Sequence, residues 1–236
     1  MSMQSFLTPD KLYFKQGCLS IALRELVDVY HVSRVLIVTD ETLFRAGRLA
    51  PVTCRLHEMG LDYAVNSESY IPDAVIVFSD CISAERWNAL PAGVPRILIP
   101  AAVCSNFCKP CIGAEMVILD EDLIPADDAV PVIHKRILEH AWSALTGAGA
   151  SDYTLAWAVQ AMRTVFDGHA DKSALLHAFW LAHQAFWNAK IPDEPDAQDM
   201  TAEAAEALGM TPDALQEKIR EAGDAEKQYA KAHYHK

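Results

Sequence analysis

The chain has 236 residues, a formal net charge of −12 and a 51% share of hydrophobic residues. This length exceeds the roughly 100–150 residues of a typical domain, so it predicts two compact units, and the apolar share excludes global disorder. The negative charge repels phosphate backbones and anionic lipid, so we expect neither nucleic acid nor a membrane as a partner.

The sequence also favours a cytoplasmic location. No apolar run approaches the roughly 20 residues that a membrane-spanning helix needs. The N-terminus, MSMQSFLTPDKLYF, has neither a basic start nor an apolar signal core. We therefore expect the six cysteines to be thiols or metal ligands rather than structural disulfides.

The first half of the chain alternates apolar runs with amphipathic segments. A short strand is expected at 12–14, and helical spacing predicts helices over 19–29 and 50–59. Continuous apolar runs, typical of parallel strands covered on both faces, occupy 35–38, 74–78, 96–99 and 116–119. This alternation predicts an α/β, nucleotide-binding-like domain with a parallel sheet over residues 1–130.

The pattern changes to helices alone over residues 131–190. Helical spacing covers 133–145, 152–166 and 172–189, and Ser151 is a suitable N-cap for the second of these helices. We predict an all-helical domain here, with Trp157, Trp180 and Trp187 packed between its helices.

Residues 191–236 are expected to form a linker and C-terminal helices. The acidic, proline-containing stretch 191–199 predicts an exposed linker. Two short helices follow, the second with Thr211 as N-cap, Pro212 at its first position and an end at Gly223. Residues 201–223 have the look of a helix-turn-helix, but the exposed acids of the second helix favour a helical hairpin used for packing over DNA binding.

Four segments carry a resemblance to a known family. They are LYFKQGCLSIALREL (12–26), VLIVTDETLFRAG (35–47), SDYTLAWAVQAMRTVF (151–166) and HAFWLAHQAFWNA (177–189). In this order they resemble the group III, iron-containing alcohol dehydrogenases, most closely the alcohol dehydrogenase half of bifunctional aldehyde–alcohol dehydrogenases, in a shortened and degenerate form. The resemblance implies a nucleotide-binding α/β domain, a helical domain, NAD(P) and a bound iron.

Two loops depart from the cofactor motifs that this resemblance implies. The family's GGGS turn reads FSDCIS at 78–83, which places Asp80 where a pyrophosphate would lie. The family's IPTTxGTGSE-like loop reads IPAAVCSNFC at 99–108. Asp40 matches the acidic residue that in the family can face the adenosine ribose, so Thr39 and Asp40 are the candidate cofactor-binding residues. Asp40 is alternatively a loop-capping residue.

The implied metal site retains one family position. The family uses an Asp and a His four residues later, plus two later histidines. His140 occupies the His position, whereas Arg136 places a permanent cation at the Asp position. His177 and His183 are six residues apart, which puts them on opposite faces of one helix, and we do not add them to the site. We therefore expect no cofactor, although NAD(P) and iron are implied by the family.

A cysteine motif offers separate chemistry. Cys104, Cys108 and Cys111 form CxxxCxxC, a spacing that suits an iron–sulfur cluster, zinc or a redox site. Because cysteine is a common small buried residue, three incidental thiols are the favoured alternative.

Three functional hypotheses follow. The first is a catalytically impaired homologue, a pseudoenzyme scaffold that binds a protein partner or forms a homo-oligomer. In that case we expect Leu176, Phe179, Trp180, Phe186 and Trp187 to leave apolar surface on their helix. The second is an NAD(P)-dependent alcohol or aldehyde oxidoreductase with residual activity. The third is a thiol-based metal or redox protein that uses the three cysteines.

Overall fold

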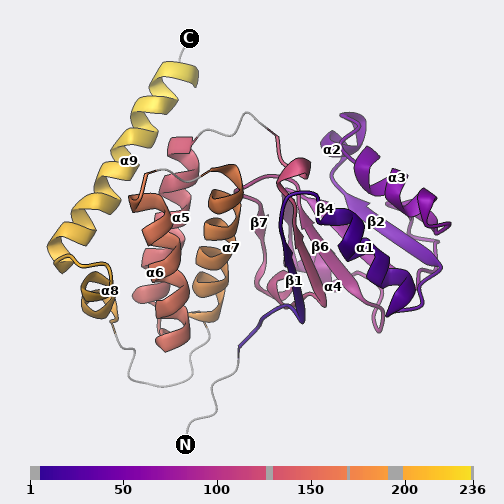
Figure 1. Cartoon of the computed structure of the whole chain (residues 1–236), viewed down its shortest axis with the longest axis horizontal. Helices are drawn as coiled ribbons and strands as arrows, with labels where there is room; N and C mark the ends of the chain where they lie inside the picture. Colours follow the sequence, from indigo (N-terminus) through magenta and orange to yellow (C-terminus); the bar gives the residue numbers. More distant parts are fainter. Residues whose placement is uncertain (1–5, 126–129, 169–170, 191–198, 235–236) are drawn as a thin grey trace, which may run out of the picture. The chain divides into compact units, whose positions relative to one another are not determined.

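The structure, a computed structural model, describes residues 6–125, 130–168, 171–190 and 199–234. It divides into two compact units, one spanning Leu7–Ala126 and the other Asp127–Lys236 with the N-terminal Met1–Phe6. Figure 1 shows both units coloured along the chain. No helix in the described ranges combines the length and the apolar character needed to cross a bilayer.

The first unit is built on a parallel sheet of six strands in the order β1-β8-β6-β4-β2-β3. These strands are β1 (Lys11–Phe14), β2 (Arg34–Thr39), β3 (Asp62–Val65), β4 (Ala74–Ser79), β6 (Arg96–Pro100) and β8 (Met116–Leu119). The four predicted apolar runs form the central strands, and every residue of β4 and β8 is buried. The predicted parallel-sheet class is confirmed.

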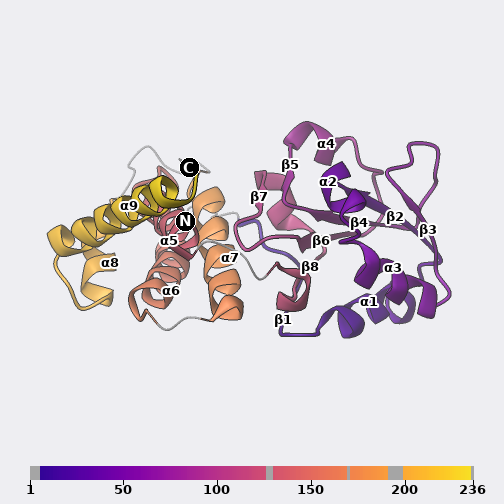
Figure 2. The same cartoon turned by 90° about the horizontal axis from the view of Figure 1, so that it is seen from above.

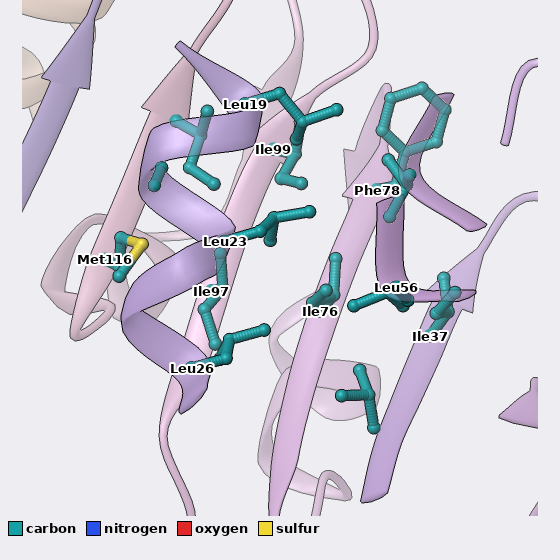
Figure 3. Close-up of a cluster of buried hydrophobic side chains, with 14 of the residues drawn as sticks. Leu19, Leu23, Leu26, Ile37, Leu56, Ile76, Phe78, Ile97, Ile99 and Met116 are labelled. Carbon is teal, nitrogen blue, oxygen red and sulfur yellow. The ribbon is translucent and has the colours of Figure 1, made fainter. Parts of the chain in front are cut away.

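Helices cover both faces of this sheet. Helices α1 (Leu19–Asp28) and α3 (Ala50–Glu58) lie on one side and α4 (Ala84–Asn88) lies on the other (Figure 2). The side chains of Leu19, Leu23 and Leu26 point from α1 toward Ile97, Ile99 and neighbouring strand residues (Figure 3). Alternate strand residues therefore build the core on this face, as the period of two along a strand requires.

Short elements, absent from the sequence prediction, complete the first unit. They are α2 (Glu41–Arg45) and the 3-10 helices η1 (Lys109–Gly113) and η2 (Glu121–Leu123). Strands β5 (Cys81–Ile82) and β7 (Asn106–Phe107) pair in parallel to form a second, two-stranded sheet. β5 and β7 follow β4 and β6, so this small sheet joins the two loops that depart from the cofactor motifs.

The second unit contains the predicted helices, of which α5, α6 and α7 lie side by side (Figure 1). They are α5 (Val130–Leu145), α6 (Asp152–Phe166) and α7 (Lys172–Asn188), followed by α8 (Thr201–Ala207) and α9 (Pro212–Tyr234). Ser151 caps α6 as expected, because its hydroxyl accepts from the Thr154 N–H. Residues 191–198, the larger part of the predicted linker, lie outside the described residues.

Two predictions for the second unit are wrong. Helix α9 does not end at Gly223 but continues to Tyr234, because the residues beyond Gly223 are mostly strong helix formers that outweigh one glycine. The expected apolar surface on α7 is also largely missing. Leu176, Phe179 and Trp180 are buried, and Phe186 and Trp187 are half-buried.

Candidate functional site

The sheet order places one crevice at the carboxyl ends of β2 and β4. The chain passes from β2 to β3 on one side and then to β4 on the other side of β2, so the direction of winding reverses there. In open α/β sheets such a switch point is where ligands bind. Thr39 and Asp40 end β2, and Ser79 and Asp80 end β4, so the predicted cofactor residues lie at this crevice.

The Asp40 carboxylate is engaged by groups of its own chain. Its Oδ2 accepts from the Ser79 hydroxyl at 2.5 Å and from the Asp80 N–H at 3.2 Å. Its Oδ1 lies 3.5 Å from Nη1 of Arg86, which belongs to α4. Asp40 therefore ties the end of β2 to the loop after β4, which is the loop-capping alternative for this residue.

Thr39 is fixed by Asn66, the residue after β3. The Thr39 N–H donates to the Asn66 Oδ1 at 3.0 Å, and the Asn66 amide returns a bond to the Thr39 carbonyl at 3.1 Å. Arg86 Nη2 donates to the same carbonyl at 2.9 Å. Asn66 has a φ of 49°, in the left-handed region that asparagine tolerates better than most residues. Sequence reasoning missed both Asn66 and Arg86.

The turn after β4 uses its backbone donors internally. The Asp80 N–H binds Asp40, and the Cys81 N–H donates to the Ser79 hydroxyl at 3.1 Å. The Asp80 carbonyl accepts from the Asn106 N–H at 2.6 Å, which begins the pairing of β5 with β7. A dinucleotide pyrophosphate needs free backbone donors at such a turn. The residues present at this turn therefore do not fit a bound NAD(P) pyrophosphate.

His140 lies in an aromatic cluster between α5 and α7. Its ring makes edge contacts with Phe179 and Phe186, with ring centroids 5.4 and 4.8 Å apart. Its Nδ1 lies 2.8 Å from the Arg136 carbonyl, so this nitrogen donates the hydrogen bond. Burial lowers the pKa of His140, which keeps the ring neutral at pH 7.

His183 of α7 lies beside His140, with ring centroids 5.3 Å apart. The six-residue spacing between His177 and His183 describes positions on α7 alone. It therefore could not predict the packing of α5 on α7, which brings His140 beside His183. The His183 Nε2 accepts from the Trp187 indole at 3.0 Å. Trp187 in turn lies under Lys190, whose Nζ is 4.7 Å from the ring centroid.

This cluster does not fit an iron site. Within the described ranges, no group of three or more His, Cys, Asp or Glu side chains is arranged to hold a metal ion. Glu139, the acid next to His140, forms its ion pair with Lys135 at 3.2 Å and is turned to the surface. The position that the family resemblance assigns to an Asp ligand holds Arg136. A divalent cation needs several such donors.

The cysteine motif separates into a pair and a third residue. Cys108 and Cys111 are adjacent, with their sulfur atoms 3.2 Å apart, whereas Cys104 lies in the loop before β7. All six cysteines are thiols. The structure thus brings together two of the three predicted residues.

Comparisons with solved structures show which proteins share this architecture. An iron-containing alcohol dehydrogenase from Thermococcus thioreducens matches with a TM-score of 0.67 and 18% identity, over 94% of this chain and 85% of that chain. A 1,3-propanediol oxidoreductase matches with a TM-score of 0.67 and 16% identity, over 94% and 86%. The chain has the fold of the iron-containing alcohol dehydrogenases.

A third similar structure carries a cofactor. The sulfoacetaldehyde reductase from Bifidobacterium kashiwanohense, solved in complex with NAD+, matches with a TM-score of 0.65 and 11% identity, over 95% of this chain and 86% of that chain. No protein-family model and no curated protein matches the sequence. The iron-containing alcohol dehydrogenase fold confirms the α/β unit and the helical unit that the four resembling segments imply.

Proposed function

We propose that this protein is an iron-containing alcohol dehydrogenase homologue that has lost catalysis and acts as a scaffold that binds a protein partner. The observation that carries the proposal is the engagement of Asp40 by Ser79, Asp80 and Arg86. A ribose hydroxyl that approached this carboxylate would have to displace donors that are already in place. The turn that would receive the pyrophosphate likewise donates its N–H groups within the chain.

The residues around His140 support the same proposal. A metal-activated alcohol requires a cation held by several oxygen or nitrogen ligands in a defined geometry. Here Phe179 and Phe186 pack against the His140 ring, and the His183 Nε2 accepts a hydrogen bond from the Trp187 indole N–H. This arrangement suits the packing of two helices.

Partner binding draws support from exposed apolar side chains on the first unit. Leu12 on β1, the terminal strand of the sheet, is 41% exposed, and Ile21 on α1 is 66% exposed. Exposed terminal strands and apolar side chains favour association with another chain. A second copy of this chain or a related dehydrogenase is the partner class that we propose.

A second candidate is a nicotinamide-dependent oxidoreductase with residual activity. A cavity of about 360 Å³ lies beside the crevice and includes Leu36, Val38, Tyr70 and Arg86 in its lining. The Thr39 hydroxyl is buried and has no hydrogen-bond partner among the described residues, which is unusual for a buried polar group. Both features favour some binding capacity near β2.

Turnover measurements distinguish these two candidates. The purified protein is incubated anaerobically with NAD+ or NADP+, ethanol or 1,3-propanediol, and added Fe²⁺ or Zn²⁺. We expect no metal-dependent NAD(P)H formation. Metal-dependent turnover that disappears in His140→Ala would contradict the scaffold proposal and establish the residual enzyme.

The partner is tested by sedimentation and by co-purification from the native cells. We expect a dimer or a heteromeric complex that dissociates in Leu12→Lys or Ile21→Lys, each of which places a charge on an exposed apolar position. The control is Glu68→Lys, at an exposed position that is already charged. A monodisperse monomer with no co-purifying protein would overturn partner binding.

A further inference from the structure

The segment Cys108-Lys109-Pro110-Cys111 forms the first turn of the 3-10 helix η1. Cys108 is the N-cap, and the Cys111 N–H donates to the Cys108 carbonyl at 3.0 Å. This hydrogen bond between positions i and i+3 closes a four-residue turn and brings its first and last residues close together. The local backbone therefore holds the two sulfur atoms 3.2 Å apart. A disulfide bond is about 2.05 Å long, so closure requires the sulfurs to approach by about 1 Å.

The two thiols differ in accessibility. Cys111 is fully buried, and so are Phe107 before the pair and Ile112 after it. Cys108 is half-buried and lies next to Pro110, which is exposed. A molecule from solution can therefore reach the Cys108 sulfur first, and the Cys111 sulfur lies behind it in the interior.

The surrounding backbone fixes this arrangement. β7, which ends at Phe107, is paired with β5. On the other side the Ala114 N–H donates to the Cys111 carbonyl at 3.1 Å. Burial, with a smaller contribution from the neighbouring Cys108, raises the pKa of the Cys111 thiol far above its usual range. Cys111 is therefore protonated in the reduced protein.

We propose that Cys108 and Cys111 form a dithiol–disulfide couple that reduces accessible disulfides, with Cys108 as the attacking and Cys111 as the resolving thiol. This inference does not rest on the proposed function, because it needs neither a nicotinamide cofactor nor iron. Cys104 is not part of the couple, and the described residues contain no assembled third ligand for a metal reading of the motif.

The exchange proceeds in two balanced steps. Cys108 loses its proton, and its sulfur attacks one sulfur of a disulfide RS–SR. A mixed disulfide Cys108–S–SR forms, and the departing RS⁻ takes up a proton to give RSH. Cys111 then loses its proton and attacks the Cys108 sulfur, which breaks the mixed disulfide and releases the second RSH. The two protein thiols are oxidised to a disulfide, and RS–SR is reduced to two thiols.

Oxidised glutathione is the probe, and the protein carries Cys54→Ser and Cys81→Ser to remove its two exposed thiols. In this background we expect two glutathiones released per chain and a Cys108–Cys111 disulfide in the non-reducing peptide map. Cys111→Ser should release one glutathione and retain the other on Cys108. Cys108→Ser should release none from this segment, and Cys104→Ser is the matched control that should behave as the background does.

A second arm distinguishes small from protein disulfides, with insulin as the protein substrate and dithiothreitol as the terminal reductant. Acceleration of insulin reduction that disappears in Cys108→Ser would support the couple and identify a protein disulfide as its substrate. The peptide map of the background protein needs no variant at position 111, so the test stands if Cys111→Ser fails to fold. Reaction with neither probe, or a disulfide that joins Cys104 to Cys108, would overturn the proposal.

Discussion

At the scale of the residue, one buried carboxylate organises the loops next to β1 and β8. Asp120, which follows β8, is 2% exposed and accepts from the backbone N–H groups of Gly17 and Leu19, both at 2.8 Å. Gly17 has a φ of 70°, where a side chain would be strained. The start of α1 therefore depends on a residue about one hundred positions later in the chain.

Replacing Asp120 by alanine should leave three backbone donors, the N–H groups of Gly17, Leu19 and Asp122, without their acceptor. At about 1–3 kcal/mol for each buried, unsatisfied group, we expect Asp120→Ala to lower the free energy of unfolding by about 2–4 kcal/mol. Urea unfolding followed by circular dichroism measures the loss. The control is Asp122→Ala, which removes an exposed carboxylate that accepts from Gln16. Equal losses in the two variants would contradict this account of Asp120.

The same scale shows what sequence alone could predict about the crevice. Asp40 stands out because it follows an apolar strand, and its place at the end of β2 is as expected. Its donors Ser79 and Arg86 lie 39 and 46 positions later and carry no local signal. The choice between a ribose ligand and a loop cap depends on those partners, so the local sequence leaves both alternatives open.

At the scale of the element, one carboxylate joins the starts of β2 and β4. Asp73 accepts from the Arg34 side chain at 2.8 Å, from the Ser33 hydroxyl at 2.8 Å and from the Arg34 N–H at 3.0 Å. Arg34 and Ser33 hold the pKa of Asp73 well below its usual range. These bonds favour the charged form of Asp73.

This lowered pKa predicts an acid-sensitive contribution to stability. The contribution is fully present above the unfolded pKa of about 3.9 and is lost as the pH falls toward the folded value. Because the pair is partly exposed, we expect Asp73→Asn to cost about 1–2 kcal/mol at pH 7 and progressively less below pH 4. Urea unfolding of both proteins at pH 7, 5 and 3.5 measures this difference. A difference that grows with acidity would contradict the assignment.

The C-terminal helices offer a matched pair of glycines, Gly223 inside α9 and Gly209 between α8 and α9. A Cβ at Gly223, inside the helix, would meet nothing within 4 Å, and the same holds for Gly209, which has a φ of 69°. We expect Gly223→Ala to stabilise the protein by about 0.5–1 kcal/mol, because alanine is the better helix former. Gly209→Ala should destabilise it, because its backbone is left-handed. Thermal unfolding of the two variants tests this, and a destabilising Gly223→Ala would contradict a continuous helix.

Some elements follow from the hydrophobic pattern of the sequence, and others do not. Strands β2, β4, β6 and β8 were predicted because their apolar runs are covered on both faces. β5 and β7 contain two residues each and exist through their pairing with one another, so no periodicity reveals them. Their pairing nevertheless joins the two loops in which the cofactor motifs are expected.

At the scale of the whole molecule, the fold and the chemistry of the site depend on different residues. The order of strands and helices follows from hydrophobic patterning, and the likeness to iron-containing alcohol dehydrogenases extends over 94% of the chain. The side chains of the site stand at a few loop positions, and the same fold accepts many different residues at these positions. The fold can therefore be retained while the groups that bind cofactor and metal change.

The measurement that tests the central claim most directly is a fluorescence titration of the purified protein with NADH and NADPH, made under anaerobic conditions. Each lost charge-assisted hydrogen bond to the pyrophosphate costs about 1–3 kcal/mol, and each 1.4 kcal/mol is about a factor of ten in Kd. The engaged Asp40 and the internally bonded turn after β4 predict no saturation at micromolar concentrations of either nucleotide. Saturable binding with a micromolar Kd would contradict the claim.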